Sequence, residues 1–126
     1  MENLEDVVKH RLNKSDEALQ EAQVLAKMDH YNTAVSCLYY AVFYSVSALL
    51  LKDKIYSKSH TGLKSKFHEH IMKEHKLGAK VAKVYQELFE YRQDADYADF
   101  IVFAKEEFEP LFERAQTFIK EIKTLI

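Results

Sequence analysis

The chain has 126 residues, enough for one domain built around one hydrophobic core. It contains only 2 glycines and 1 proline, whereas average usage predicts about nine and about six, so turn-rich β-sandwiches and barrels are excluded. With 48% apolar residues the chain can bury a core, and its net charge of −2 by itself indicates no partner. We therefore expect a single all-α domain over residues 1–126.

The first two predicted helices are long. Over residues 4–26, apolar side chains recur close to the helical period of 3.6 residues. The second helix, from Tyr31 to about Lys52, is apolar nearly all round, which predicts a central position, and Asp29 is a plausible N-cap for it.

Three further helices follow a polar loop between Asp53 and His60. A short helix carries apolar residues at four-residue steps, and Gly78 stands where its C-terminal cap would fall. A fourth helix starts at about residue 79. The fifth has the clearest apolar stripe, and because Pro110 cannot lie deep in a helix, it either starts near Glu109 or bends there. The prediction is an up-down antiparallel bundle of four to five helices.

The second helix also raises the question of a membrane. Residues 31–51 carry no charge and are long enough to span a bilayer. Asn32, Thr33, several serines and several tyrosines make the segment polar for lipid, so we expect a protein-buried helix and no membrane contact. Cys37 is the only cysteine, which excludes an internal disulfide and favours a reducing compartment, most simply the cytoplasm.

The small net charge conceals two charged segments of opposite sign. Residues 52–83 hold nine lysines and three acids, and residues 84–113 hold nine acids, one lysine and one arginine. These segments are either ordinary solvated helix faces, a basic surface for phosphates, or complementary surfaces in a dimer.

Three stretches then carry a recognisable pattern. They read NTAVSCLYYAVF at 32–43, KSHTGL at 58–63 and RQDADY at 92–97. In order, spacing and chain length they resemble the HEPN domain, in particular the small stand-alone UPF0332 proteins. The resemblance implies a helical bundle that commonly dimerises. It also implies relatives that are metal-independent ribonucleases, toxins neutralised by a minimal nucleotidyltransferase, or nucleotide-binding modules.

The family's ribonuclease motif is an arginine followed, after four to six residues, by a histidine. Arg92 matches the arginine, but Tyr97 stands where the histidine is expected. Cleavage needs a group that accepts the 2′-hydroxyl proton, and a tyrosine of pKa about 10 serves poorly at neutral pH. Asp96 offers a carboxylate base, yet acids here repel an RNA backbone. Arg92 either clamps a phosphate or pairs with Asp96 one turn later.

The remaining candidates are ligand-binding residues. Tyr39 and Tyr40 either stack a base or belong to the core with partnered hydroxyls. The resemblance implies that this pair lies near the helix that carries Arg92, so Tyr40, Arg92, Asp96 and Tyr97 form one candidate site. His60 either contacts ligand or caps the third helix, and Lys64 and Lys66 are candidate phosphate contacts. The histidines between residues 60 and 75 lack matching acidic or cysteine ligands, so no metal site and no cofactor are expected.

These observations predict a homodimeric module that binds RNA or nucleotide, as the toxin-like half of a pair with a minimal nucleotidyltransferase. The first alternative is an active endoribonuclease that uses Arg92 with Tyr97 or Asp96. The second is a structural helical adaptor without a ligand.

Overall fold

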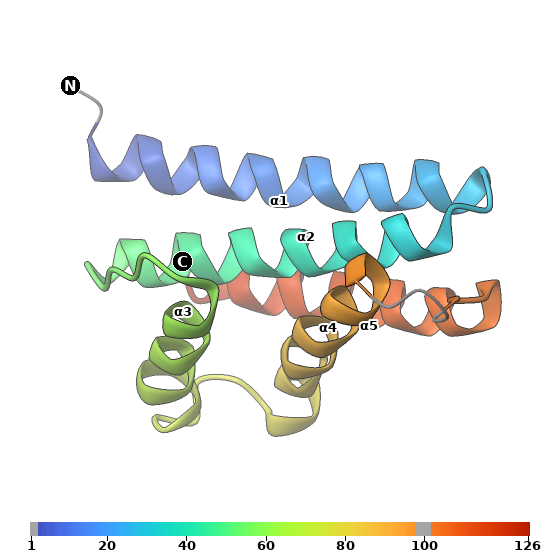
Figure 1. Ribbon diagram of the computed structural model, residues 1–126. Coiled ribbons are helices and arrows are strands. Elements are labelled where there is room, and N and C mark those ends of the chain that lie inside the picture. Colours follow the sequence, from blue (N-terminus) through green and yellow to red (C-terminus); the bar gives the residue numbers. More distant parts are fainter. Residues whose placement is uncertain (1–2, 98–101) are drawn as a thin grey trace.

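The computed structural model describes residues 3–97 and 102–126, apart from the side chains of 95–97. Every element in this part is a helix, which confirms the predicted all-α bundle (Figure 1). The elements are α1 (Leu4–Lys27), α2 (Tyr31–Lys52), α3 (His60–Phe67), a short π-helical continuation η1 (His68–Met72), α4 (Ala79–Tyr97) and α5 (Lys105–Thr124).

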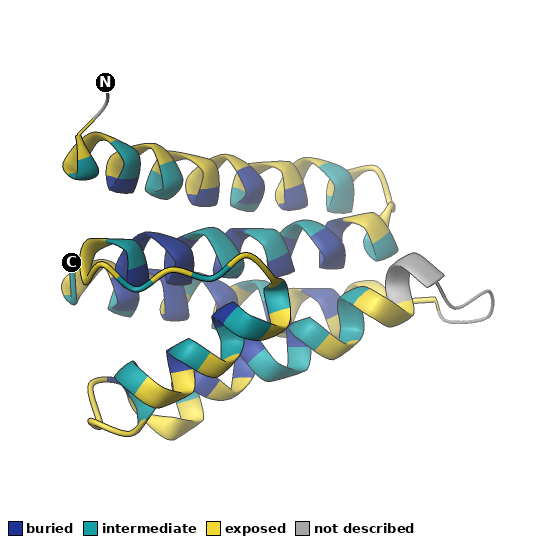
Figure 2. Ribbon diagram, turned by 60° about the vertical axis from the view of Figure 1, so that its left-hand side comes forward, coloured by how far each residue is buried: buried dark blue, intermediate teal, exposed yellow. Residues whose placement is uncertain are grey.

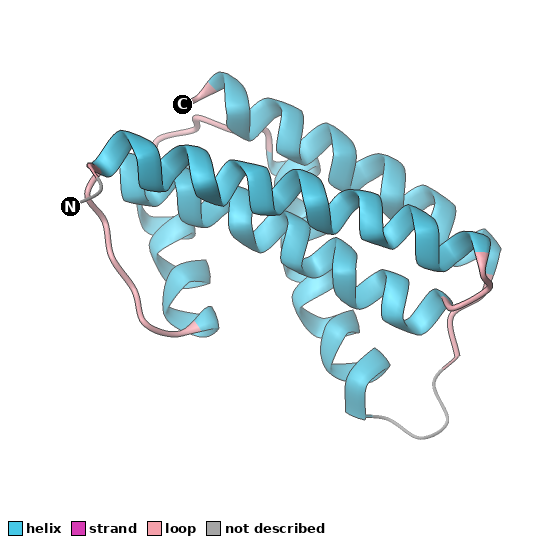
Figure 3. Ribbon diagram, turned by 90° about the horizontal axis from the view of Figure 1, so that it is seen from above, coloured by secondary structure: helices cyan, strands magenta, loops and turns pink. Residues whose placement is uncertain are grey.

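The helices are arranged around α2, which contacts α1, α3, α4 and α5. In Figure 1, α1 and α2 lie antiparallel and α5 lies along the other side of α2, whereas α3 and α4 cross these long helices steeply. The view from above in Figure 3 shows the same layering, with both chain ends at one end of the bundle. The crossing pair α3 and α4 therefore meets the middle of α2 from one side.

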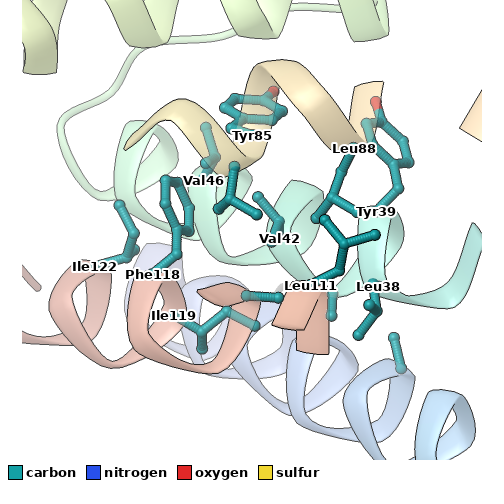
Figure 4. Close-up of a cluster of buried hydrophobic side chains, with 14 of the residues drawn as sticks. Leu38, Tyr39, Val42, Val46, Tyr85, Leu88, Leu111, Phe118, Ile119 and Ile122 are labelled. Atoms are coloured by element: carbon teal, nitrogen blue, oxygen red, sulfur yellow. The ribbon is translucent and has the colours of Figure 1, made fainter. Parts of the chain in front are cut away.

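The core is formed by the inward sides of these helices. Figure 2 shows buried residues where helices face one another and exposed residues along the outer side of α1. Large side chains fully enclosed in it are Leu38, Tyr39, Val42, Phe67, Tyr85, Leu88, Phe118 and Ile122, several of which are drawn in Figure 4. Burial of such side chains is a major source of hydrophobic stabilisation.

Helix α2 is the described segment that passes a length and composition test for a membrane span. Its mean hydropathy is 1.8 over the most apolar window, and 72% of that window is buried by the protein itself. A helix that is apolar nearly all round and is enclosed by its neighbours is what the core of a helical bundle requires.

Two predicted helix caps were wrong. The N-cap of α2 is His30, and Asp29 instead adopts a left-handed conformation with a φ of 62°. At the end of η1 the left-handed residue is His75, with a φ of 54°, whereas Gly78 opens α4 by accepting a hydrogen bond from the Ala82 amide. Asp29 and Gly78 each lie close to a helix boundary, but neither occupies the capping position predicted for it.

Helix α5 begins at Lys105, four residues before Glu109, so of the two predicted alternatives the start near Glu109 is wrong. Its N-cap is Ala104, whose backbone amide donates to the Glu107 carboxylate at 3.1 Å. Pro110 consequently lies inside the helix, where it withholds one backbone donor. The acidic first turn, which suits the positive end of a helix, offsets part of that loss.

Candidate functional site

The arginine of the 92–97 stretch lies over two tyrosine rings from α2. The Arg92 guanidinium carbon is 5.6 Å from the centre of the Tyr39 ring and 5.5 Å from that of Tyr40. Both distances allow an attractive cation–π interaction. The structure therefore brings Arg92 against an adjacent pair of tyrosines that lies 52 residues earlier in the sequence.

His60 completes this group from the first turn of α3. Its ring stacks on Phe43 with centroids 4.4 Å apart and planes 15° apart, and on Tyr39 at 5.7 Å. We call Tyr39, Tyr40, Phe43, His60 and Arg92 the arginine site. Three helices, α2, α3 and α4, supply its members.

The local sequence at the start of α3 presents His60 in this position. Ser59, not His60, caps the helix: its hydroxyl accepts a hydrogen bond from the Gly62 amide at 2.9 Å. A Cβ at position 62 would collide with the hydroxyls of Ser57 and Ser59, so a larger residue there would displace the capping hydroxyl of Ser59. With the capping role filled by Ser59, the imidazole is directed to the rings of α2.

A short hydrogen bond joins buried Tyr39 to half-buried His60. Tyr39 Oη lies 2.6 Å from His60 Nδ1, and either group can be the donor, depending on the histidine tautomer. Burial raises the pKa of the Tyr39 hydroxyl, so it keeps its proton at neutral pH. Burial and then the Arg92 charge lower the pKa of His60, which favours a neutral imidazole.

Of the two lysines expected to contact phosphate, one adjoins the site. Lys64 Nζ is 4.9 Å from the centre of the Phe89 ring and donates to Gln86 Oε1 at 2.7 Å, and Phe89 in turn contacts Tyr39. Lys66 instead lies 3.9 Å from Glu69 Oε2. Two residues apart on a helix means opposite faces, which explains the separation.

Two predicted catalytic residues cannot be placed. The backbone of α4 extends to Tyr97, but the side chains of Asp96 and Tyr97 lie outside the described residues. Their roles stay predictions from sequence. Within the described ranges, no group of three or more histidine, cysteine, aspartate or glutamate residues is arranged to hold a metal ion.

The environment of His60 predicts an acid-sensitive fold. Because the folded state lowers the pKa of His60 below 6.5, the unfolded chain takes up this proton first on acidification. Its contribution to stability is therefore full above about pH 6.5 and is lost as the pH falls toward the lowered value. His60→Gln should make the fall in unfolding free energy between about pH 7 and pH 5 shallower, as measured by urea titration.

A second histidine refines that measurement. Burial and then Lys64 also lower the pKa of His68, so His68→Gln should remove a further part of the slope. If His60→Gln keeps the full wild-type slope, the imidazole at this site does not titrate as its surroundings require.

The chain is similar to a known protein family over nearly its whole length. The model of the HEPN domain matches residues 8–125, nearly the whole chain. The chain belongs to the HEPN domain family. A UPF0332 protein of Thermotoga maritima is 31% identical over 126 residues, covering 100% of this chain and 96% of that protein.

Two proteins of Methanocaldococcus jannaschii whose names describe them as candidate toxins are also similar. One is 34% identical over 112 residues, covering 89% of this chain and 76% of the relative. The other is 29% identical over 109 residues, covering 86% and 81%. The resemblance identified from three short stretches is thus confirmed over most of the HEPN chain.

Sequence reasoning on the HEPN pattern found the residues of the arginine site except Phe43, which stands four residues after Tyr39 and so shares its helix face. It also missed Phe89, which lies between Lys64 and Tyr39. The sequence did not indicate that the Arg92 charge acts on His60, because this depends on how α3 and α4 pack on α2.

Proposed function

We propose that this HEPN chain is a toxin-like module that binds single-stranded RNA or a nucleotide at the arginine site. The observation that carries the proposal is the position of the Arg92 guanidinium above the rings of Tyr39 and Tyr40. A guanidinium can hold a phosphate with two hydrogen bonds, and tyrosine rings offer faces on which bases stack.

The surrounding charge supports a phosphate ligand. Lys64 adjoins the site through Phe89, and residues 52–83, which include α3, carry nine of the chain's lysines. A basic surface of this kind attracts polyanions and gives binding that weakens with salt. The toxin-candidate names of two relatives favour the same class of function.

The proposal extends to the assembly. We place the chain in the cytoplasm as a homodimer, paired with a minimal nucleotidyltransferase. The basic 52–83 segment and the acidic 84–113 segment are complementary, which favours self-association. The purified chain should then have twice the monomer mass in sedimentation equilibrium.

Lys64→Ala should weaken RNA binding and reduce its salt dependence. One phosphate contact fewer lowers the slope of log affinity against log salt by about 1 unit. The measurement is fluorescence anisotropy of a labelled single-stranded oligonucleotide in EDTA, repeated at several salt concentrations.

Lys66→Ala is the matched control for that measurement. It removes the same charge from the same helix, but Lys66 lies against Glu69 rather than beside the arginine site. It should therefore leave the salt slope close to wild type. Equal slopes for both variants would locate RNA away from this site, and absence of RNA and nucleotide binding would favour the adaptor without a ligand.

A second function, metal-independent ribonuclease activity, is favoured by the position of His60. When Nδ1–H donates to Tyr39, the Nε2 atom has no proton and can accept the one released by an attacking 2′-hydroxyl. His60 would thus supply the imidazole that the 92–97 motif lacks. Denaturing gels of the same RNA mixtures test this: cleavage in EDTA that His60→Gln abolishes would establish it over simple binding.

A further inference from the structure

A hollow between α1 and α2 adjoins the arginine site. It has a volume of about 280 Å³ and is lined by Lys14, Glu17, Ala18, Glu21, Cys37, Tyr40 and Tyr44. We call it the α1 hollow. Small-molecule pockets usually span about 300–1,000 Å³, so this one suits a single base rather than a complete nucleotide.

Tyr40 is shared by the arginine site and the α1 hollow. Its ring lines the α1 hollow and lies 5.5 Å from the Arg92 guanidinium. On the same face of α2, one turn later, the Tyr44 ring lies 6.4 Å from that of Tyr40. A ligand that reaches around Tyr40 can therefore touch the arginine site and the α1 hollow at once.

The two places differ in charge. Arg92 and Lys64 make the arginine site attractive to a phosphate, while the α1 hollow is lined by two exposed carboxylates, Glu17 and Glu21, against one ammonium, Lys14. A phosphate is repelled by these carboxylates, so a nucleotide would be oriented with its phosphate at Arg92 and its base in the hollow.

The rim also has a chemical preference among bases. Glu17 and Glu21 are four residues apart, share a face of α1 and both line the hollow, so their carboxylates are within reach of a base held there. Guanine is the RNA base whose Watson–Crick edge carries two adjacent donors, the ring N1–H and the exocyclic amino group. Adenine and cytosine place a ring acceptor beside their amino group, and uracil places its N–H between two carbonyls.

We infer that the α1 hollow binds the guanine base of a guanosine phosphate, alone or within RNA. One carboxylate of the Glu17 and Glu21 pair accepts both guanine donors, and the base stacks against Tyr40 and Tyr44. Lys14, whose Nζ is 5.5 Å from the centre of the Tyr44 ring, holds that ring beneath a cation. The inference rests on the proposed binding of RNA or nucleotide at the arginine site.

The test compares oligonucleotides that differ in one base. Labelled oligouridylates with a central guanine, adenine, cytosine or inosine are titrated in EDTA at fixed salt. Guanine should bind roughly 5- to 150-fold tighter than adenine, because a good bidentate contact discriminates by that amount. Inosine, which lacks the exocyclic amino group, should fall between them.

Glu17→Gln and Glu21→Gln, singly and together, separate base recognition from simple charge. Removing a carboxylate that only repels RNA strengthens every oligonucleotide equally. Removing one that reads guanine weakens the guanine oligonucleotide relative to the others. Glu5→Gln makes the same charge change near the start of α1 and should keep the wild-type preference.

The outcomes test the guanine pocket separately from the proposed binding of RNA at the arginine site. Equal effects of the glutamine variants on all four oligonucleotides overturn the guanine pocket and leave RNA binding intact. Binding that does not depend on Arg92 overturns the proposed function itself. A matching preference for GMP over AMP assigns the pocket to the guanosine phosphate alone, and a preference seen only in oligonucleotides assigns it to RNA.

Discussion

Arg92→Ala should weaken the binding of single-stranded RNA by roughly 10- to 150-fold. Hydrogen bonds to a charged partner contribute about 1.5–3 kcal/mol, which corresponds to that range of affinity. The loss should be similar for all base sequences, because a phosphate contact positions RNA without reading it. Anisotropy titrations against oligonucleotides of different composition measure both the size and the uniformity of the effect.

Arg92→Lys and Lys120→Ala are the informative companions of that variant. Lysine keeps the charge but loses the planar pair of donors, so it should restore only part of the affinity. Lys120 is an exposed cation on α5, outside the basic 52–83 segment, and its removal should change binding little. Full affinity in Arg92→Lys would mean that charge alone matters, and full affinity in Arg92→Ala would remove the arginine from the binding site.

Tyr39→Ala should lower the free energy of unfolding by about 3–5 kcal/mol, as large aromatic-to-alanine changes do in protein cores. The Tyr39 side chain is 0% exposed and touches both the core and the arginine site. Its removal leaves a cavity beside α4 and takes away one ring beneath Arg92. Urea denaturation followed by circular dichroism measures the loss.

Tyr39→Phe divides that effect into its parts. The ring stays, and only the hydrogen bond to His60 Nδ1 is lost, which should cost about 1–3 kcal/mol. Phe118→Ala is a control of equal severity that lies in the core. It should destabilise the fold as much as Tyr39→Ala while the folded fraction keeps its RNA affinity. A Tyr39→Ala variant as stable as wild type would contradict the central position of this ring.

The helices themselves were predictable because their signal is local. The second helix was placed at 31–52 and is found there, since an uncharged run between polar segments leaves little choice of boundary. The caps were less predictable. Asp29 has the right side chain for an N-cap, but its backbone takes a left-handed conformation, and His30 precedes the helix.

The site was only partly predictable, for a physical reason. The family pattern grouped Tyr40 with Arg92, but the position of His60 against Tyr39 depends on the steep crossing of α3 and α4 over α2 (Figure 1). The difference between Lys64 and Lys66 likewise needed the orientation of α3 on its neighbours. Glu17 and Glu21 were not predicted as site residues, because exposed charges on the first helix are typical of solvated surface. Only the structure shows that they line the α1 hollow.

Helix α2 should limit which substitutions this sequence can tolerate during evolution, because it serves both the core and the candidate site. Along one helix, Leu38, Tyr39 and Val42 close the core, while Tyr40 faces both Arg92 and the α1 hollow. A substitution in α2 affects both the stability of the fold and the contacts to a ligand, so few replacements are tolerated. Sequence drift should therefore concentrate on the outer side of α1, and relatives that have changed ligand should differ first at Glu17, Glu21 and Tyr44.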